Sequence, residues 1–166
     1  TGTVVVSNGV DTCTITLLNG AGECIFTPSF PGQPDLELFY SGDERFNQSS
    51  DTVAGPLVNK ADTSIASLIF DPSNLVVGQE TTIDVHVVVD APGAGIPSGD
   101  VVVSNGSDTC TVTLDSTGSG SCQFMPTAPG SPDLTADYSG DSNFNASTLG
   151  VAGPVVAKSE TSISEF

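Results

Sequence analysis

The sequence predicts an all-β protein made of sandwich domains in tandem, and three observations lead to that prediction. Apolar and polar residues alternate with the period of two that marks strands with one buried face. Proline residues and asparagine–glycine pairs separate short runs rich in valine, isoleucine and threonine. The same residues recur in the same order 97 to 98 positions later, so the folding unit is a repeated domain.

The repeat is visible from the first residue. Thr1–Gly9 returns as Ser98–Gly106, a shift of 97, and after a one-residue insertion Tyr40–Asp43 returns as Tyr138–Asp141. A period of this size exceeds solenoid repeats and is that of a whole small domain. The predicted segments are a partial copy at 1–60, which lacks the counterparts of 63–97, a complete copy at 61–157, and the start of a third copy at 158–166.

Short strands account for most of the complete copy. In Ile83–Val89 the residues at 83, 85, 87 and 89 share one face, and no long stretch shows helical spacing. About seven strands with one apolar face each require a second sheet to cover that face, which indicates immunoglobulin-type sandwiches. The predicted strands lie near 63–70, 75–77, 80–90, 99–104, 108–115, 121–126, 133–139 and 147–156.

Asparagine–glycine pairs mark the turns between strands. Asn8–Gly9 and Asn105–Gly106 lie between β-type runs, and Asn19–Gly20 follows the next run in the first copy. This dipeptide is favoured in two-residue hairpins because both positions need a positive φ. The pattern therefore predicts antiparallel pairing of neighbouring strands.

Four cysteines allow three disulfide pairings. Cys13 and Cys24 lie on consecutive predicted strands and share the apolar face, as do Cys110 and Cys122. Pairing within each copy is favoured, as a cross-strand disulfide that faces the core and stabilises its domain by roughly 3 kcal/mol. A metal site would need closer ligand spacing and more histidine. Disulfides predict an oxidising compartment outside the cytosol.

Charge excludes two classes of partner. Asp and Glu number 20 against 3 Lys and Arg, which gives a net charge of -17. Arg45, Lys60 and Lys158 are too few to bind nucleic acid or an anionic membrane surface. No apolar run is long enough for membrane insertion, and no cofactor is expected. The acidic exterior would keep repeated domains from clumping.

One motif carries a family resemblance. Tyr138–Phe144, together with Ser98–Val101 and Gly120–Phe124, resembles the bacterial Ig-like repeat domains of large surface proteins, and the motif recurs at Tyr40–Phe46. The resemblance implies a tandem spacer of an adhesin, cell-wall protein or secreted polymer, without an active site. The cysteines depart from the family, which commonly has apolar or small residues at those positions. That departure suggests selection for durability.

Few residues qualify as binding or catalytic sites. His86 lies on an outward strand face without a second histidine or a placed nucleophile, and we expect it to be a surface residue. Asp43 and Asp141 could bind calcium with neighbouring oxygen ligands. Because no spacing resembles an established calcium loop, capping of the turn backbone is the favoured role. The N-glycosylation acceptor pattern is matched at Asn47, Asn105 and Asn145.

The partial copy poses a physical problem. Residues 1–60 can supply five strands but lack the counterpart of the central strand 80–90, so an apolar sheet face and a sheet edge would be open. The first residues lack a signal peptide, and the repeat favours a chain that continues upstream and supplies the missing strands. The alternative is strand complementation, in which the tail Lys158–Phe166 enters the open copy of the next molecule and builds a fibre. The tail, equivalent to Lys60–Leu68, covers only the first missing strand.

These features together predict a non-enzymatic extracellular structural protein, a spacer or fibre whose partners are neighbouring copies or adjacent repeats. The alternative is an adhesin module that binds a glycan or protein through end loops at 91–97, 115–120 and 140–146. An enzyme is the third option, and it would need a polar cluster that the sequence does not offer.

Overall fold

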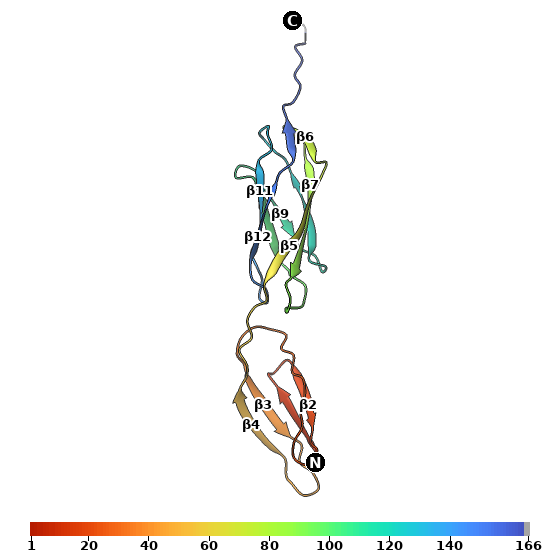
Figure 1. Ribbon diagram of the computed structural model, residues 1–166, viewed down its shortest axis with the longest axis vertical. Helices are drawn as coiled ribbons and strands as arrows, with labels where there is room; N and C mark the ends of the chain where they lie inside the picture. The colour runs from red at the N-terminus through yellow and green to blue at the C-terminus, as the bar shows by residue number, and fades with distance from the viewer. Residues whose placement is uncertain (165–166) are drawn as a thin grey trace. The chain divides into compact units, whose positions relative to one another are not determined.

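The chain folds as two compact units in a computed structural model that describes residues 1–164 (Figure 1). Unit 1 is Thr1–Lys60, and unit 2 begins at Ala61. The described residues form strands, turns and loops without a helix, which confirms the all-β prediction. Accordingly, nothing within 1–164 forms the long apolar helix that could span a membrane.

Unit 2 is a sandwich of two antiparallel sheets. One sheet has the order β10–β7–β5 and the other β12–β11–β8–β9, while β13 and β6 form a short parallel pair. Figure 1 shows β5 and β7 in one layer and β11 and β12 in the other. The strands are β5 (Thr63–Asp71), β6 (Asn74–Val76), β7 (Thr81–Val89), β8 (Asp100–Ser104), β9 (Thr109–Thr113), β10 (Ser119–Phe124), β11 (Asp133–Tyr138), β12 (Ser147–Ala152) and β13 (Val155–Ala157).

The core of unit 2 lies between these two sheets. Alternate residues of each strand point inward, as the period of two predicts, and the outward residues Asp84 and His86 of β7 are exposed or half-buried. Tyr138 and Phe124 are the largest of the fully buried side chains. The inward residues include Ile83, Val85, Val87, Val101, Val103, Val112, Leu134 and Ala136. This packing confirms the immunoglobulin-type sandwich.

The last predicted strand, 147–156, proves to be two strands. Pro154 has no backbone N–H to donate, so the β12 ladder ends at Ala152. Gly153 then donates its N–H to the carbonyl of Pro132 at 3.0 Å, and β13 leaves the β11–β12 sheet to pair with β6. A strand count of about seven is therefore too low for unit 2.

The turn predictions are partly wrong. Asn19–Gly20 has the two positive φ angles expected, at 54° and 82°. At residues 8–11 and 105–108 the loops are longer than two residues, and only their glycines have positive φ. The asparagine instead accepts backbone hydrogen bonds: the Asn105 side-chain oxygen receives the N–H groups of Ser107 and Asp108. A side chain that completes a turn in this way removes the need for a second positive φ.

Unit 1 is a single described sheet with the order β2–β1–β3–β4. It repeats the β9–β8–β11–β12 sheet of unit 2 in the same register, since Val6 faces Cys13 as Val103 faces Cys110. The bounds are β1 (Thr3–Ser7), β2 (Thr12–Thr16), β3 (Asp35–Tyr40) and β4 (Ser49–Ala54).

The fifth strand predicted for residues 1–60 is absent. Its counterpart in unit 2 is β10, which hydrogen-bonds to β7 from Ser119 to Phe124. Unit 1 contains no counterpart of β7, and residues 22–28 form no strand. An isolated edge segment without a ladder partner keeps an irregular backbone.

Candidate functional site

Both disulfides form within their own copy, as the sequence predicts. Cys13 bonds Cys24 and Cys110 bonds Cys122, each with a Cα–Cα distance of 6.0 Å. The bridge in unit 2 joins the consecutive strands β9 and β10, which are edge strands of different sheets. The turn between them carries the chain from one layer to the other. The bridge in unit 2 therefore closes the sandwich along one side.

Asp141 fastens the β11–β12 loop to the start of β8. Its two carboxylate oxygens accept the backbone N–H groups of Asn143 and Phe144 at 2.8 and 2.9 Å, and the backbone and hydroxyl groups of Ser98 at 2.9 and 2.7 Å. Tyr138 donates its hydroxyl to the Ser98 carbonyl at 2.8 Å. These contacts tie the Tyr–Ser–Gly–Asp–x–x–Phe motif to the residue that precedes β8.

The pKa values of Asp141 and Tyr138 follow from burial and hydrogen bonding. Burial alone would raise the pKa of Asp141, but the hydrogen bonds from Ser98, Asn143 and Phe144 lower the pKa below its usual value. Burial and the nearby Asp141 charge raise the pKa of Tyr138 to about 12. Near neutral pH the pair is thus a carboxylate acceptor beside a neutral hydroxyl donor.

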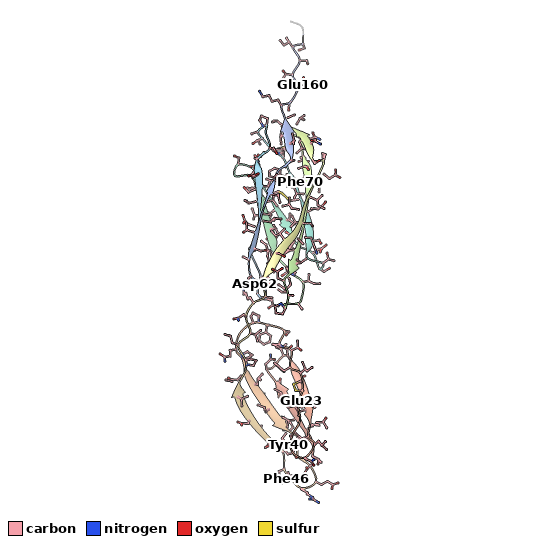
Figure 2. All side chains as sticks on the ribbon, in the orientation of Figure 1. Glu23, Tyr40, Phe46, Asp62, Phe70 and Glu160 are labelled. Atoms are coloured by element: carbon pink, nitrogen blue, oxygen red, sulfur yellow. A yellow bond between two sulfur atoms is a disulfide. The ribbon has the colours of Figure 1, made fainter. Side chains whose placement is uncertain are left out.

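In unit 1, Asp43 and Tyr40 make the same kinds of hydrogen bond as Asp141 and Tyr138, but without a buried core beside them. Asp43 accepts the N–H groups of Arg45 and Phe46 at 2.8 and 2.9 Å and the Thr1 hydroxyl at 2.8 Å. The Arg45 N–H and the Thr1 groups hold the pKa of Asp43 well below its ordinary value. Tyr40 and Phe46 lie near the same end of unit 1, and Tyr40 donates to the Thr1 carbonyl at 2.7 Å (Figure 2).

The two aspartates singled out for calcium serve as turn caps. Their oxygens receive protein N–H and O–H groups, the role that the spacing of the motif favours. Within residues 1–164, no three or more His, Cys, Asp or Glu side chains gather closely enough to hold a metal ion. Calcium affinity stays an untested prediction.

The acceptor asparagines differ in their surroundings. Asn47 is exposed in the β3–β4 loop, whereas Asn105 is half-buried and its amide nitrogen donates to Asp108 at 3.1 Å. Asn145 is exposed and donates to Asp62 at 2.8 Å. Of the three, Asn47 presents its amide most openly. Glycosylation at these positions stays a prediction.

His86 lies on the outward face of β7 and joins two strands. Its Nδ1 lies 2.9 Å from the Ser119 hydroxyl on β10. This contact links β7 and β10 on the sheet surface, so the histidine has a structural role there.

Sequence reasoning missed a second aspartate that fixes a distant loop by hydrogen bonds. Asp108 accepts the backbone N–H and hydroxyl of Thr127 at 3.0 and 2.8 Å, and Asp11 makes the same pair of contacts with Ser29. These hydrogen bonds lower the pKa of both aspartates. The signal was available, because the Asp–Thr–Cys run occurs in both copies.

Three loops of unit 2 lie together at one end of the sandwich. Gly95 packs on the ring of Phe144, and a side chain placed at Gly118 would approach Pro97 and Ile96. These contacts join the loops predicted at 91–97, 115–120 and 140–146. Ile96 is 55% exposed, so the cluster presents an apolar side chain beside polar turns.

The open face of unit 1 is the main unpartnered surface of the described structure. We use this name for the inward-type residues of its sheet, whose counterparts in unit 2 are buried at 8% exposure or less. Phe46 shows the difference most clearly, because it is 65% exposed while Phe144 is 6% exposed. A shallow hollow beside Phe46 is also lined by Leu17 and Tyr40. The open face consists of Val4, Ile15, Leu17, Phe26, Leu36, Leu38, Tyr40 and Phe46, which are half-buried or exposed, whereas Val6 of the same sheet is buried at 8% exposure.

Comparison with known proteins identifies the fold family. The family described as bacterial Ig-like domain (group 3) matches residues 68–156, which is more than half of the chain and nearly all of unit 2. No curated protein and no solved structure matches the chain. The matched range begins within β5 and ends within β13, so it covers both sheets of the sandwich just described. The chain belongs to the bacterial Ig-like domain (group 3) family.

Proposed function

We propose that this chain is an extracellular structural module, a spacer or stalk of a cell-surface or secreted protein. The observation that supports the proposal best is the closed sandwich of unit 2. Hydrogen bonds hold the loops of this unit in place: Tyr138 and Asp141 bond Ser98, and Asp108 bonds Thr127. Their hydrogen bonds hold the backbone of these loops in place, which suits a domain that must resist stretching.

The proposed mechanism is mechanical. The two antiparallel sheets must shear or separate for unit 2 to extend, and each route disrupts backbone ladders and buried β-branched residues. The Cys110–Cys122 bridge adds a covalent link between the sheets. Disulfides and the membership in this family support a location outside the cytosol. The net charge of -17 would keep neighbouring modules apart.

Force spectroscopy on the full chain tests the mechanical role. Unit 2 should unfold as a distinct event, and reduction should lengthen the released chain by the 12-residue Cys110–Cys122 separation. That length is about 40 Å at roughly 3.6 Å per residue. Extension of unit 2 at forces no higher than those of an unstructured chain would overturn the stalk proposal.

The location has its own test. We expect alkylation of native material to modify no cysteine until a reductant is added, because the described cysteines are paired. Free thiols in freshly isolated protein would contradict the proposed compartment.

We also propose that the chain has no enzymatic role and needs no cofactor. The carboxylates of Asp43, Asp115 and Asp141 each accept backbone N–H groups of their own turns, which supports a capping role. Turnover in a broad hydrolase screen, lost on heat denaturation, would refute this.

An adhesin module is the second candidate. The three loops that meet near Ile96 and Phe144 favour it, because end loops of a sandwich are a usual place for recognition. Binding on a glycan array or to a surface protein, weakened by Ile96→Ser but not by Ile69→Ser on β5, would support this role. Equal binding by both variants would exclude the loop cluster.

Assembly into a fibre, in which the tail fills the open copy of the next molecule, is the alternative to completion of unit 1 by an adjacent repeat. Residues 158–164 are exposed and form no strand, whereas Glu165 and Phe166 of the predicted donor lie outside the described residues. An accessible tail equivalent to Lys60–Leu68 is suited to strand addition. Concentration-dependent polymers that disappear when residues 158–166 are deleted would support the fibre, and a strict monomer would remove it.

A further inference from the structure

The open face of unit 1 has a partner that can be inferred from unit 2. We propose that this face is a docking surface for a segment with the sequence pattern of residues 61–97, carried by a further repeat of the same kind. Residues 61–97 contain β5, β6 and β7 and cover the corresponding face in unit 2. The inference rests on the correspondence between the two sheets and is independent of the spacer role.

The side chains of the two faces are apolar at corresponding positions, with Leu38 where unit 2 has Ala136 and Ile15 where it has Val112. Val101 and Leu134 of unit 2 are 0% exposed in a core that includes Ile83, Val85 and Val87 of β7. Their counterparts Val4 and Leu36 are half-buried. The face therefore has the apolar character to pack against alternate β-branched residues from a strand of the β7 type.

The backbone of unit 1 also has an edge ready for this partner. In unit 2, β10 obtains its ladder from β7, with Cys122 opposite Ile83 and Gly120 opposite Val85. Residues 22–28 contain the corresponding positions, and the Cys13–Cys24 bridge tethers them to β2. A docking strand of the β7 type would supply the hydrogen bonds that turn this segment into a strand.

Phe46 adds a third, separate contact. In unit 2, the ring of Phe144 is covered by Gly95, and Ala61 pairs with the neighbouring backbone through Asn143 and Asn145. The contacts of Gly95 and Ala61 thus join the two ends of the 61–97 segment to the β11–β12 loop. Unit 1 presents the same loop, and its Phe46 is 65% exposed. The polar partner is in place as well, since Asn47 is the counterpart of Asn145, which binds Asp62.

Two other occupants fit less of the surface. The tail 158–166 corresponds only to Lys60–Leu68, so it supplies part of a β5-type strand and nothing that pairs with residues 22–28. A second unit 1 stacked face to face would bury the apolar residues but would likewise provide no ladder for that segment. Residues 61–97 satisfy the apolar face, the backbone edge and Phe46 together.

The test extends the full chain at its N-terminus with a second copy of residues 61–97, so that Pro97 of the added copy precedes Thr1 as Pro97 precedes Ser98. Hydrogen exchange followed by mass spectrometry reads each segment separately. We expect amide exchange in residues 22–28 to slow to within about tenfold of that in β10. β1 and β3 should slow in parallel toward β8 and β11.

The matched control carries Ile83→Asp and Val85→Asp in the added copy alone, and it should leave residues 22–28 in fast exchange. Equal protection, or no protection, with the two extensions would overturn the proposal. Dimers of the unextended chain that already protect residues 22–28 would assign the face to a second copy instead. Protection of the unextended chain that is lost when 158–166 are deleted would assign it to the tail.

Protection of β8 and β11 in the same digest verifies that unit 2 is folded. If the extension disturbs unit 2, a peptide of residues 61–97 added to the unextended chain gives the same readout, and the same peptide with Ile83→Asp and Val85→Asp is its control. Force spectroscopy of unit 2 does not involve the open face. The docking inference and the spacer proposal can therefore fail separately.

Discussion

Phe46 and Phe144 follow the same Tyr–Ser–Gly–Asp run, yet the first is 65% and the second 6% exposed. Around them the local contacts are the same: Asp43 and Asp141 each accept two backbone N–H groups of their own loop. The difference lies in the second sheet, which unit 2 has and unit 1 lacks. Turn caps therefore form from local sequence, whereas burial and the β10 strand depend on β5 and β7.

The largest difference is expected from truncating the two phenylalanines. Phe144→Ala should destabilise unit 2 by about 3 to 5 kcal/mol, because it empties a site in the packed core. Phe46→Ala should change the stability of unit 1 by no more than about 0.5 kcal/mol, because its ring is mostly in water. Urea unfolding monitored by hydrogen exchange of β8 and β1 peptides separates the two units. Similar costs for the two variants would mean that unit 1 has a covered core.

Removal of the disulfides should come next in size. The double change Cys110→Ala and Cys122→Ala should cost unit 2 roughly 3 kcal/mol in the chain-entropy model. In unit 1, Cys13→Ala with Cys24→Ala should chiefly release residues 22–28, detected as faster proteolysis there. Unchanged cleavage of that segment would show that contacts other than the bridge hold it.

Loss of one buried hydroxyl should have a smaller effect. Tyr138→Phe removes the hydrogen bond to the Ser98 carbonyl from a residue that is 1% exposed, and should cost about 1 kcal/mol. Tyr40→Phe should cost less, because water can reach the Thr1 carbonyl in unit 1. A greater loss for Tyr40→Phe in matched urea titrations would reverse the comparison.

The smallest effect concerns acid. Hydrogen bonding lowers the folded-state pKa of Asp108, Asp115 and Asp141, so their stabilisation is complete above the unfolded value near 4. It is lost as the pH falls through the folded values. We expect the melting temperature of unit 2 to be flat from pH 7 to about 5 and to decline below about pH 4. Asp141→Asn should lower the melting temperature of unit 2 at pH 7 and make its drop between pH 5 and acid pH smaller. A decline of undiminished size in the variant would exclude Asp141 as a contributor.

Much of unit 2 could be predicted from sequence because its signals are local or repeated. The alternation in Ile83–Val89 predicts β7, and the shared apolar parity of Cys110 and Cys122 predicts their pairing. The break at Pro154 was overlooked because the residues on both sides have strand character. Whether the bridge lies within one sheet or between two depends on which strands share hydrogen bonds. The alternation of apolar and polar residues shows the face of a residue but not the partner of its strand.

Unit 1 illustrates the other limit. Cys24 and Phe26 have the same alternation as Cys122 and Phe124, so the pattern alone predicts a strand in both copies. A strand also needs a partner, and only β10 has one in the described residues. The hydrogen bonds of Asp11 and Asp108 went unpredicted because their partners, Ser29 and Thr127, lie 18 and 19 residues away.

Hydrogen exchange of the unmodified full chain compares β1 and β3 with β8 and β11 in one sample, and so measures how far the second sheet protects the first. We predict that β8 and β11 exchange only through unfolding of unit 2 and that β1 and β3 exchange much faster. Equal protection of the two pairs of strands in a monomer would contradict the account, since it would mean that four strands hold their core without a second sheet.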